Sequence, residues 1–213
     1  MERIKDAMLL YAVTDRAWVG KQTLAQQVES ALKGGATCVQ LREKQLDKEA
    51  FLAEALEIKE LCHQYKVPFF IDDDVDIAIR SGADGIHVGQ SDMEAGNVRR
   101  LVGDKMILGV SAQTVEQAVT AEAAGADYLG VGAVFPTSTK LDAEDVPHAE
   151  LKKICESVKI PVVAIGGINK GNILKLSGTG VDGVALVSAI FGAEDIEAEC
   201  KTLAALSKEM VTK

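Results

Sequence analysis

The chain has 213 residues, of which 47% are apolar and 26% charged, and its formal net charge is −9. This composition is typical of a globular protein and excludes a largely disordered chain, while the acidic balance excludes nucleic acid as the expected partner. No apolar run approaches the roughly 20 residues that span a bilayer, and the N-terminal segment lacks a secretory signal, so we expect a cytoplasmic protein without membrane contact.

Short apolar runs alternate along the chain with longer segments of helical periodicity. The short runs predict eight strands, at residues 8–14, 37–42, 68–72, 85–89, 106–111, 128–134, 161–166 and 183–188. The longer segments predict eight helices, at residues 23–33, 47–65, 75–81, 93–102, 114–124, 148–158, 170–177 and 194–210. Thr23 with Gln26, and Thr114 with Gln117, have the spacing of a capping box at two helix starts. Eight such units predict either an open doubly wound sheet or a closed barrel.

A short glycine-containing motif recurs before every second strand. Its copies, at residues 34–37, 82–85, 125–128 and 180–183, each end a helix and open an even-numbered strand. Recurrence at every second unit over the whole length favours a closed eightfold ring over an open sheet with distinct edges. We therefore predict a single (β/α)8 TIM barrel, one domain over residues 1–213, with its working groups at the carboxyl ends of the strands.

Polar groups follow the second and third predicted strands. Period-2 alternation places Gln40 and Arg42 on one face of the second strand, and Lys44 follows two residues later. An amide, a guanidinium and an ammonium at this spacing suit a polar ring together with phosphate oxygens. The third strand ends in consecutive acids that include Asp72 and Asp73.

Two carboxylates, Asp73 and Asp92, follow neighbouring strands and could share one hard cation. Oxygen ligands without His or Cys point to Mg²⁺ held by one or two carboxylates and a ligand phosphate. The alternative is a solvated acid at a helix start, which is our interpretation of Asp74 and Asp76. His87, inside the fourth strand, is interpreted as a packed and hydrogen-bonded histidine and not as a base or metal ligand.

The sixth strand is rich in Gly and Val and runs into a polar loop. The hydroxyls of Thr137 and Thr139 supply donors and acceptors, and Lys140 supplies a mobile positive charge. A plain turn is the alternative for this segment taken alone. The equally polar ends of the other strands favour a site for a phosphorylated ligand.

The last two strands predict a second anion site. Gly167 follows the seventh strand, and Val187 and Ser188 end the eighth, where barrels commonly bind a monophosphate through backbone N–H groups. Two phosphorylated ligands on one chain indicate a transferase that joins them. Such a reaction needs no general base, only positioning and stabilisation of the charge on the leaving group.

With these residues assembled, the sequence resembles the thiamin phosphate synthase family along essentially its full length. The matching motifs are specific as an ordered set and lie at residues 40–44, 73 with 89–92, 109–112, 136–140, 165–168 and 187–189. The resemblance implies a Mg²⁺-dependent enzyme that joins hydroxymethylpyrimidine diphosphate to hydroxyethylthiazole phosphate, or its carboxylated form, and releases diphosphate. It also implies a dissociative step, in which the diphosphate leaves before the thiazole nitrogen attacks the methylene cation.

The resemblance further implies a role for each matching residue. Gln40 and Ser111 would contact the pyrimidine, and Arg42, Lys44 and Lys140 would bind the diphosphate. Asp73 and Asp92 would bind Mg²⁺, and Thr137 and Thr139 would line the region where the two substrates meet. Gly167, Val187 and Ser188 would bind the thiazole phosphate. The catalytic groups would be Arg42, Lys44, Ser111 and Lys140.

Asp72 departs from the family pattern, which usually has an Asn that donates to the diphosphate. An ionised Asp cannot donate and would repel phosphate oxygens. Asp72 would therefore recruit metal, become protonated in the complex, or turn away.

Two other functions are compatible with parts of the pattern. One is a family relative that binds or tautomerises thiazole phosphate; the intact diphosphate-binding residues argue against it. The other is a phosphosugar isomerase of the same barrel class, which would need a positioned acid–base pair or a histidine-rich metal site. The chain has only three histidines, at positions 63, 87 and 148. The expected partners are small-molecule substrates, and the sequence leaves a homo-oligomer open.

Overall fold

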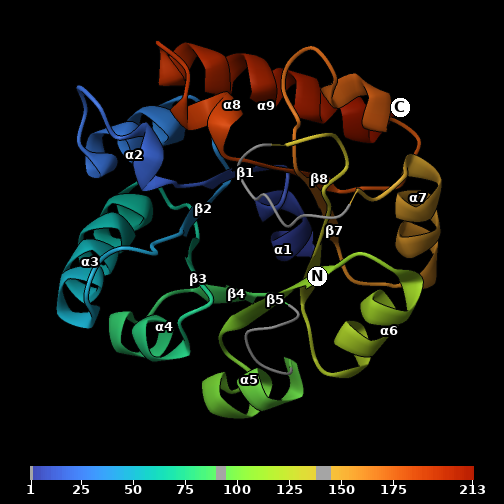
Figure 1. Ribbon diagram of the computed structural model, residues 1–213, viewed down its shortest axis with the longest axis horizontal. Helices are drawn as coiled ribbons and strands as arrows, with labels where there is room; N and C mark the ends of the chain where they lie inside the picture. Colours follow the sequence, from blue (N-terminus) through green and yellow to red (C-terminus); the bar gives the residue numbers. More distant parts are fainter. Residues whose placement is uncertain (1, 90–94, 138–144) are drawn as a thin grey trace.

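A closed barrel of eight parallel strands forms the centre of the computed structural model, which describes residues 2–89, 95–137 and 145–213 (Figure 1). The strands follow one another around the barrel in sequence order, and β8 pairs with β1 to close it. Their bounds are Leu10–Val13 for β1, Cys38–Leu41 for β2, Phe69–Asp72 for β3, Gly85–Val88 for β4, Ile107–Ala112 for β5, Tyr128–Val131 for β6, Val162–Ile165 for β7 and Gly183–Leu186 for β8. The predicted (β/α)8 barrel is confirmed, and the open sheet is excluded.

Helices surround this barrel (Figure 1). Their bounds are Glu2–Ala7 for α1, Arg16–Trp18 for the 3₁₀ turn η1, Leu24–Lys33 for α2, Lys48–Gln64 for α3, Val75–Ser81 for α4, Ala95–Val102 for α5, Val115–Ala123 for α6, His148–Ser157 for α7, Ile173–Leu176 for the 3₁₀ turn η2, Ser188–Phe191 for α8 and Ile196–Thr212 for α9. None of the helices within the described ranges is long and apolar enough to cross a membrane.

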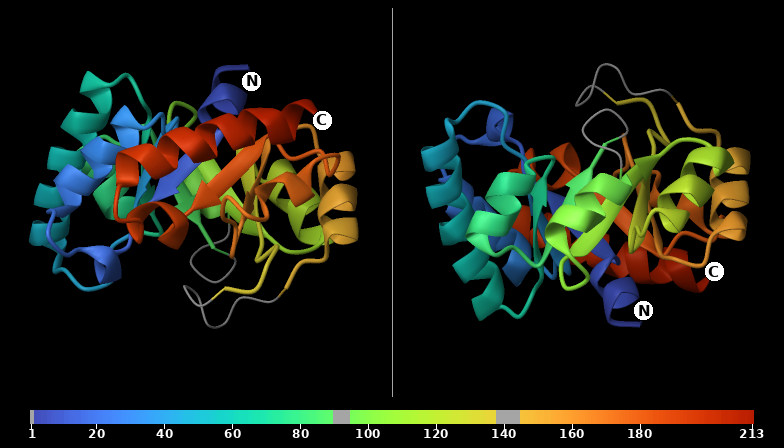
Figure 2. Two further views of the ribbon diagram at one scale, coloured as in Figure 1. Left: turned by 90° about the horizontal axis from the view of Figure 1, so that it is seen from above. Right: turned by 90° about the horizontal axis from the view of Figure 1, so that it is seen from below.

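Four helical segments differ from the prediction, and one of them is the unpredicted 3₁₀ turn η1. The helix expected at 170–177 is only the short turn η2, because Asn169 and Asn172 bond locally to the backbone: Gly171 N donates to Asn169 Oδ1 at 2.9 Å, and Asn169 N donates to Asn172 Oδ1 at 2.8 Å. The short helix α8 is separate from α9. The unpredicted α1 packs Ile4 and Ala7 against the interior of the barrel and lies at the end away from the carboxyl ends of the strands (Figure 2).

Alternation along the strands sorts the core into two layers. On β1, Leu10 and Ala12 belong to the apolar cluster between barrel and helices, whereas Tyr11 and Val13 belong to a second cluster inside the barrel. The interior cluster also holds Phe70 from β3. Side chains of this second cluster therefore fill the interior of the barrel below the cavity at its mouth.

The recurrent motif has a structural function at the amino end of the barrel. In each copy, a side-chain oxygen directly before an even-numbered strand accepts from a backbone N–H of the preceding odd-numbered strand. The pairs are Thr37 with Leu10 N at 2.8 Å, Asp84 with Phe69 N at 2.9 Å, Asp127 with Leu108 N at 2.8 Å, and Asp182 with Val162 N at 2.9 Å. These four bonds tie neighbouring strands together and pair buried donors that the ladder leaves without a strand partner.

The two predicted capping boxes form to different extents. At α2, Thr23 Oγ1 accepts from Gln26 N, and the Gln26 side chain accepts from Thr23 N, so the box is complete. At α6, Thr114 caps Gln117 N, but Oε1 of Gln117 accepts from Gln113 N. Both helices nevertheless begin at the residue after the predicted cap.

Candidate active site

A cavity of about 390 Å³ opens at the carboxyl ends of the strands. All predicted site residues within the described ranges line this cavity. They come from both ends of the sequence. These residues are Gln40, Arg42, Lys44, Asp72, Asp73, Ser111, Thr137, Gly167, Val187 and Ser188. The other three predicted residues, Asp92, Thr139 and Lys140, lie outside the described residues. The cavity has the size and the convergent polar groups of a small-molecule site.

Cations and carboxylates interleave on one wall of the cavity. Lys44 forms a short ion pair with Asp73, and its Nζ lies 3.4 Å from Oδ2 of Asp72. Nη1 of Arg42 lies 2.9 Å from Oδ2 of Asp15, and its Nε lies 3.8 Å from Oδ2 of Asp72. This wall combines two mobile positive groups with hard oxygen donors, which suits a polyphosphate bound together with a divalent cation.

Backbone geometry gives different positions to Asp73 and Asp74, the two acids that follow β3. Asp73 has a left-handed backbone, with φ of 61°, and its N–H donates to the carbonyl of His87 at 2.8 Å. Asp74 caps α4 by accepting from Ile77 N at 3.0 Å and pairs with Lys48. The interpretation of Asp74 as an acid at a helix start is confirmed, while Asp73 remains directed at the cavity.

Asp72 is the least compensated charge of this wall. Burial raises the pKa of Asp72 and the neighbouring charge of Asp73 adds to the rise, so that the pKa reaches about 6 despite the opposing effect of Lys44 and Arg42. Burial lowers the pKa of Lys44, but the hydrogen bond to Asp73 and the charge of Asp72 more than offset this effect and the pKa is raised. Asp72 therefore takes up a proton at a higher pH than an ordinary aspartate does.

The donor set on this wall fits Mg²⁺ as far as the structure describes it. Mg²⁺ in phosphate-binding sites takes one or two carboxylates, with phosphate oxygens and waters completing its shell. Asp73 offers such an oxygen at the rim of the cavity, with a quarter of its side chain exposed. Among the described residues, no three His, Cys, Asp or Glu side chains gather into a metal-binding group, and Asp92 falls outside that comparison.

The opposite wall is built from glycine and backbone. Gly166 and Gly167 both have positive φ, and a Cβ on Gly167 would lie 2.4 Å from the carbonyl oxygen of Pro136. Only glycine fits this close approach between the loops after β6 and β7. Val187 and Ser188 lie beside them where α8 begins, so backbone N–H groups of the loop and the first turn are available to an anion.

The floor of the cavity carries a line of hydrogen bonds between side chains. Nε2 of Gln40 donates to Oη of Tyr11 at 2.9 Å, and Oη of Tyr11 lies 2.9 Å from Oη of Tyr128. Nδ1 of His87 lies 3.0 Å from Oη of Tyr128, and Nε2 of His87 lies 3.0 Å from Oγ of Ser111. The prediction of a hydrogen-bonded His87 is confirmed, and the residue also lines the cavity.

Sequence reasoning missed several of these residues. Tyr11 and Tyr128 were not singled out, although both are large polar residues on the inward face of their strands. Asp15 and Glu43 were also missed: Oε1 of Glu43 accepts from Gln45 N at 2.6 Å and Oε2 accepts from Arg16 Nε at 2.7 Å. Glu43 thus fixes the loop that carries the cations on either side of it. The sequence contains two signals for these residues. Tyr11 and Tyr128 have inward positions on their strands, and Glu43 stands between two basic residues.

A comparison with family models matches residues 10–190 to a model described as thiamine monophosphate synthase. Two relatives named thiamine-phosphate synthase are similar over nearly the full length. The one from Clostridium tetani is 48% identical over 94% of this chain and 96% of its own, and the one from Ruminiclostridium cellulolyticum is 50% identical over 91% and 92%. A solved structure, thiamine phosphate pyrophosphorylase from Pyrococcus furiosus, is 40% identical with a TM-score of 0.91, covering 98% of this chain and 99% of that one.

Proposed function

The chain belongs to the thiamine monophosphate synthase family, and we propose that it joins hydroxymethylpyrimidine diphosphate to a thiazole phosphate in the cavity at the barrel mouth, releasing diphosphate. It is an enzyme of thiamine biosynthesis, a thiamine-phosphate synthase, as are the relatives that are 48% and 50% identical to it. The observation that carries the division of roles is the convergence of ten predicted residues, distant in sequence, on one cavity.

The two ends of this cavity have different chemistry, which supports two separate phosphate sites. We assign the diphosphate to the wall that carries Arg42 and Lys44, and we assign Lys140 the same role. The guanidinium and the ammonium stabilise negative charge on the leaving diphosphate, and no group needs to remove a proton from carbon. We assign the thiazole phosphate to the backbone of Gly167 and the start of α8 at Val187 and Ser188.

The pyrimidine ring belongs between these ends, against the floor. Gln40 and Ser111 lie there and offer an amide and a hydroxyl to ring nitrogens and an amino group. Thr137 lines the cavity, and we assign it, together with Thr139, to the point where the two substrates meet. Holding both substrates across one cavity brings the thiazole nitrogen to the methylene carbon as the diphosphate leaves.

We assign Mg²⁺ to Asp73 and Asp92. When bound, the ion supplies positive charge to the diphosphate and lowers its negative charge as the bond to carbon breaks. Oδ2 of Asp73 forms the short ion pair with Lys44, so an ion bound at that oxygen would compete with Lys44 for it. Lys44 would then be able to contact the phosphate oxygens.

The described geometry disfavours the phosphosugar isomerase. Of the three histidines, only His87 lines the cavity, and both of its ring nitrogens are hydrogen-bonded to Tyr128 and Ser111. His63 lies on the outside, 3.0 Å from Asp84. A relative that only binds or tautomerises thiazole phosphate would not need the wall of the cavity that carries Arg42 and Lys44.

The test is incubation with both substrates and Mg²⁺, with thiamine phosphate and diphosphate measured together. We expect equal amounts of both products, and no diphosphate release when the thiazole phosphate is omitted. Lys44→Ala should reduce turnover strongly, whereas Lys48→Ala, which removes a similar lysine paired with Asp74 outside the cavity, should not. Tautomerised thiazole phosphate without thiamine phosphate would contradict the proposal.

A further inference from the structure

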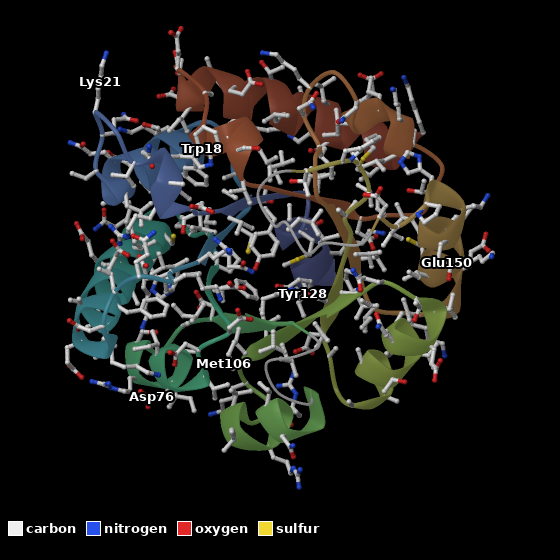
Figure 3. All side chains as sticks on the ribbon, in the orientation of Figure 1. Trp18, Lys21, Asp76, Met106, Tyr128 and Glu150 are labelled. Carbon is white, nitrogen blue, oxygen red and sulfur yellow. The ribbon has the colours of Figure 1, made fainter. Side chains whose placement is uncertain are left out.

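Five polar side chains form one continuous line across the floor of the cavity. The order is Gln40 on β2, Tyr11 on β1, Tyr128 on β6, His87 on β4 and Ser111 on β5, and each contact is between 2.9 and 3.0 Å. The two ends are the residues that we assign to the pyrimidine. The three residues between them have no assigned role. Figure 3 shows the ring of Tyr128 near the centre of the barrel.

The line has a direction, because each phenol has one proton and a neutral imidazole has one N–H. Nε2 of Gln40 donates to the oxygen of Tyr11. The direction that continues from this bond has Tyr11 donating to Tyr128, Tyr128 donating to Nδ1 of His87, and Nε2–H of His87 donating to Oγ of Ser111, and we assign this direction to the other three contacts. In this direction the hydroxyl proton of Ser111 points away from His87, and Oε1 of Gln40 remains an acceptor.

The interior of the barrel is shaped to hold these rings. A Cβ on Gly109 would lie 2.1 Å from Cζ of Tyr128, and a Cβ on Gly130 would lie 2.9 Å from Cε1 of His87. Both glycines stand inside strands, where glycine is otherwise unfavourable. The phenols of Tyr11 and Tyr128 are buried, and burial raises the pKa of both well above the usual value, so they remain donors at any physiological pH.

We propose that Tyr11, Tyr128 and His87 are positioning residues that fix the orientation of the Gln40 amide and the Ser111 hydroxyl, so that the floor presents one set of donors and acceptors to the pyrimidine. If the hydrogen-bond direction were reversed at one residue of the line, that residue and its neighbour would face each other with two donors or with two acceptors. The amide and the hydroxyl, which are contributed by β2 and β5, are therefore coupled through the line. The identity of the ligand rests on the proposed function, whereas the coupling rests on the geometry.

The chain offers a matched set of variants, since it has three tyrosines. Tyr11→Phe and Tyr128→Phe each remove one oxygen from the line and keep the ring. Tyr65→Phe removes a phenol that donates to Glu29 at 3.1 Å on the outside of the barrel and serves as the control. The first measurement is the tautomer of His87 by ¹⁵N NMR of the histidine side chains, with the signal assigned through His87→Gln. The second is the KM for each substrate, and thermal unfolding checks that all variants fold.

We expect the parent to show His87 protonated at Nε2. Tyr128→Phe removes the donor to Nδ1, so the tautomer protonated at Nδ1 gains population. Tyr11→Phe, which has no hydrogen bond to His87, should shift the population in the same direction by a smaller amount. Both should raise the KM for the pyrimidine diphosphate about tenfold and leave the KM for the thiazole phosphate nearly unchanged, because a buried polar group loses its partner.

A His87 signal in Tyr11→Phe that is identical to that of the parent would overturn the proposal, as would an unchanged KM for the pyrimidine diphosphate in both variants. Equal shifts in Tyr65→Phe would show a general effect of losing a phenol and would also overturn it. The NMR measurement needs no turnover. A parent that makes no thiamine phosphate would therefore contradict the proposed function, while the coupling along the line would still be decided by the His87 signal.

Discussion

The guanidinium of Arg42 is held by the carboxylate of Asp15, with Nη1 2.9 Å from Oδ2. Asp15 lies just after β1 and also accepts from Ala17 N at 2.9 Å, which caps η1. The group that we assign to the diphosphate therefore already has an anionic partner. A diphosphate must share Arg42 with Asp15 or displace it.

Asp15→Asn should strengthen the binding of inorganic diphosphate with Mg²⁺ by about threefold to tenfold, because it removes the competing charge and keeps a capping side chain. Isothermal titration measures this directly. The matched control is Asp74→Asn, which likewise changes the partner of a basic residue, here Lys48, and retains a helix cap but lies outside the cavity. Weaker binding in Asp15→Asn would show that Asp15 orients Arg42 and does not compete for it.

Removal of Mg²⁺ should abolish turnover, and the change Asp92→Ala should do the same, since one of two hard ligands is lost. Activity is measured in excess chelator and again after Mg²⁺ is restored. Asp76→Ala, at an exposed acid in the first turn of α4, should retain normal activity and serves as the control. Full activity in excess chelator would contradict the assignment of the metal.

Glu43→Gln should lower the stability of the protein at neutral pH by about 1–3 kcal/mol, because a buried acceptor of charged hydrogen bonds is weakened. Burial raises the pKa of Glu43, but the bonds from Arg16 and from the backbone N–H groups of Gln45 and Leu46 more than offset this and the pKa is lowered. The stabilisation is thus complete above the unfolded pKa of about 4.3 and is lost as the pH falls through the folded pKa.

Thermal unfolding of the parent and Glu43→Gln from neutral pH downward checks this, since the stabilisation by Glu43 is lost as the pH falls through its folded pKa. The difference between the two proteins should shrink as the pH falls. A constant difference over the whole range would mean that the ion pair with Arg16 is not its source. Glu57→Gln, on an exposed position of α3, should show no difference at any pH.

The sequence predicts the barrel well because the barrel depends on local patterns. The glycine motif before every second strand recurs at fixed places, and the residues Thr37, Asp84, Asp127 and Asp182 within it form equivalent bonds between strands. The ends of the strands could likewise be scanned for polar groups, and those within the described ranges meet in one cavity.

The line across the floor could not be predicted in this way. Its members come from five strands, and Tyr11 and Tyr128 are 117 positions apart. No spacing along one strand reveals that two phenols meet in the middle of the barrel. The ion pair of Asp15 with Arg42 is hidden for the same reason, since both residues stand in unrelated loops. The turn η2 was overpredicted as a helix because the local bonds of Asn169 and Asn172 compete with helical bonding.

Asp72 stands at the position where the family resemblance leads us to expect an Asn. Its side chain is 12% exposed, and Oδ2 lies 3.4 Å from Nζ of Lys44 and 3.8 Å from Nε of Arg42. It therefore lies among the cations that we assign to the diphosphate and weakens their attraction for an anion. Asparagine would keep the shape, remove the charge and supply a donor.

Asp72→Asn should therefore lower the KM for the pyrimidine diphosphate and leave the Mg²⁺ concentration for half-maximal activity unchanged. If Asp72 is itself a ligand of the metal, the same change should raise the Mg²⁺ concentration that is needed. We favour the first outcome, because we assign the metal to the adjacent Asp73 and because burial and the charge of Asp73 raise the pKa of Asp72 to about 6, which makes a second ionised carboxyl costly. Separate titrations of Mg²⁺ and of the pyrimidine substrate decide between them: a weaker response to Mg²⁺ without tighter substrate binding would assign Asp72 to the metal.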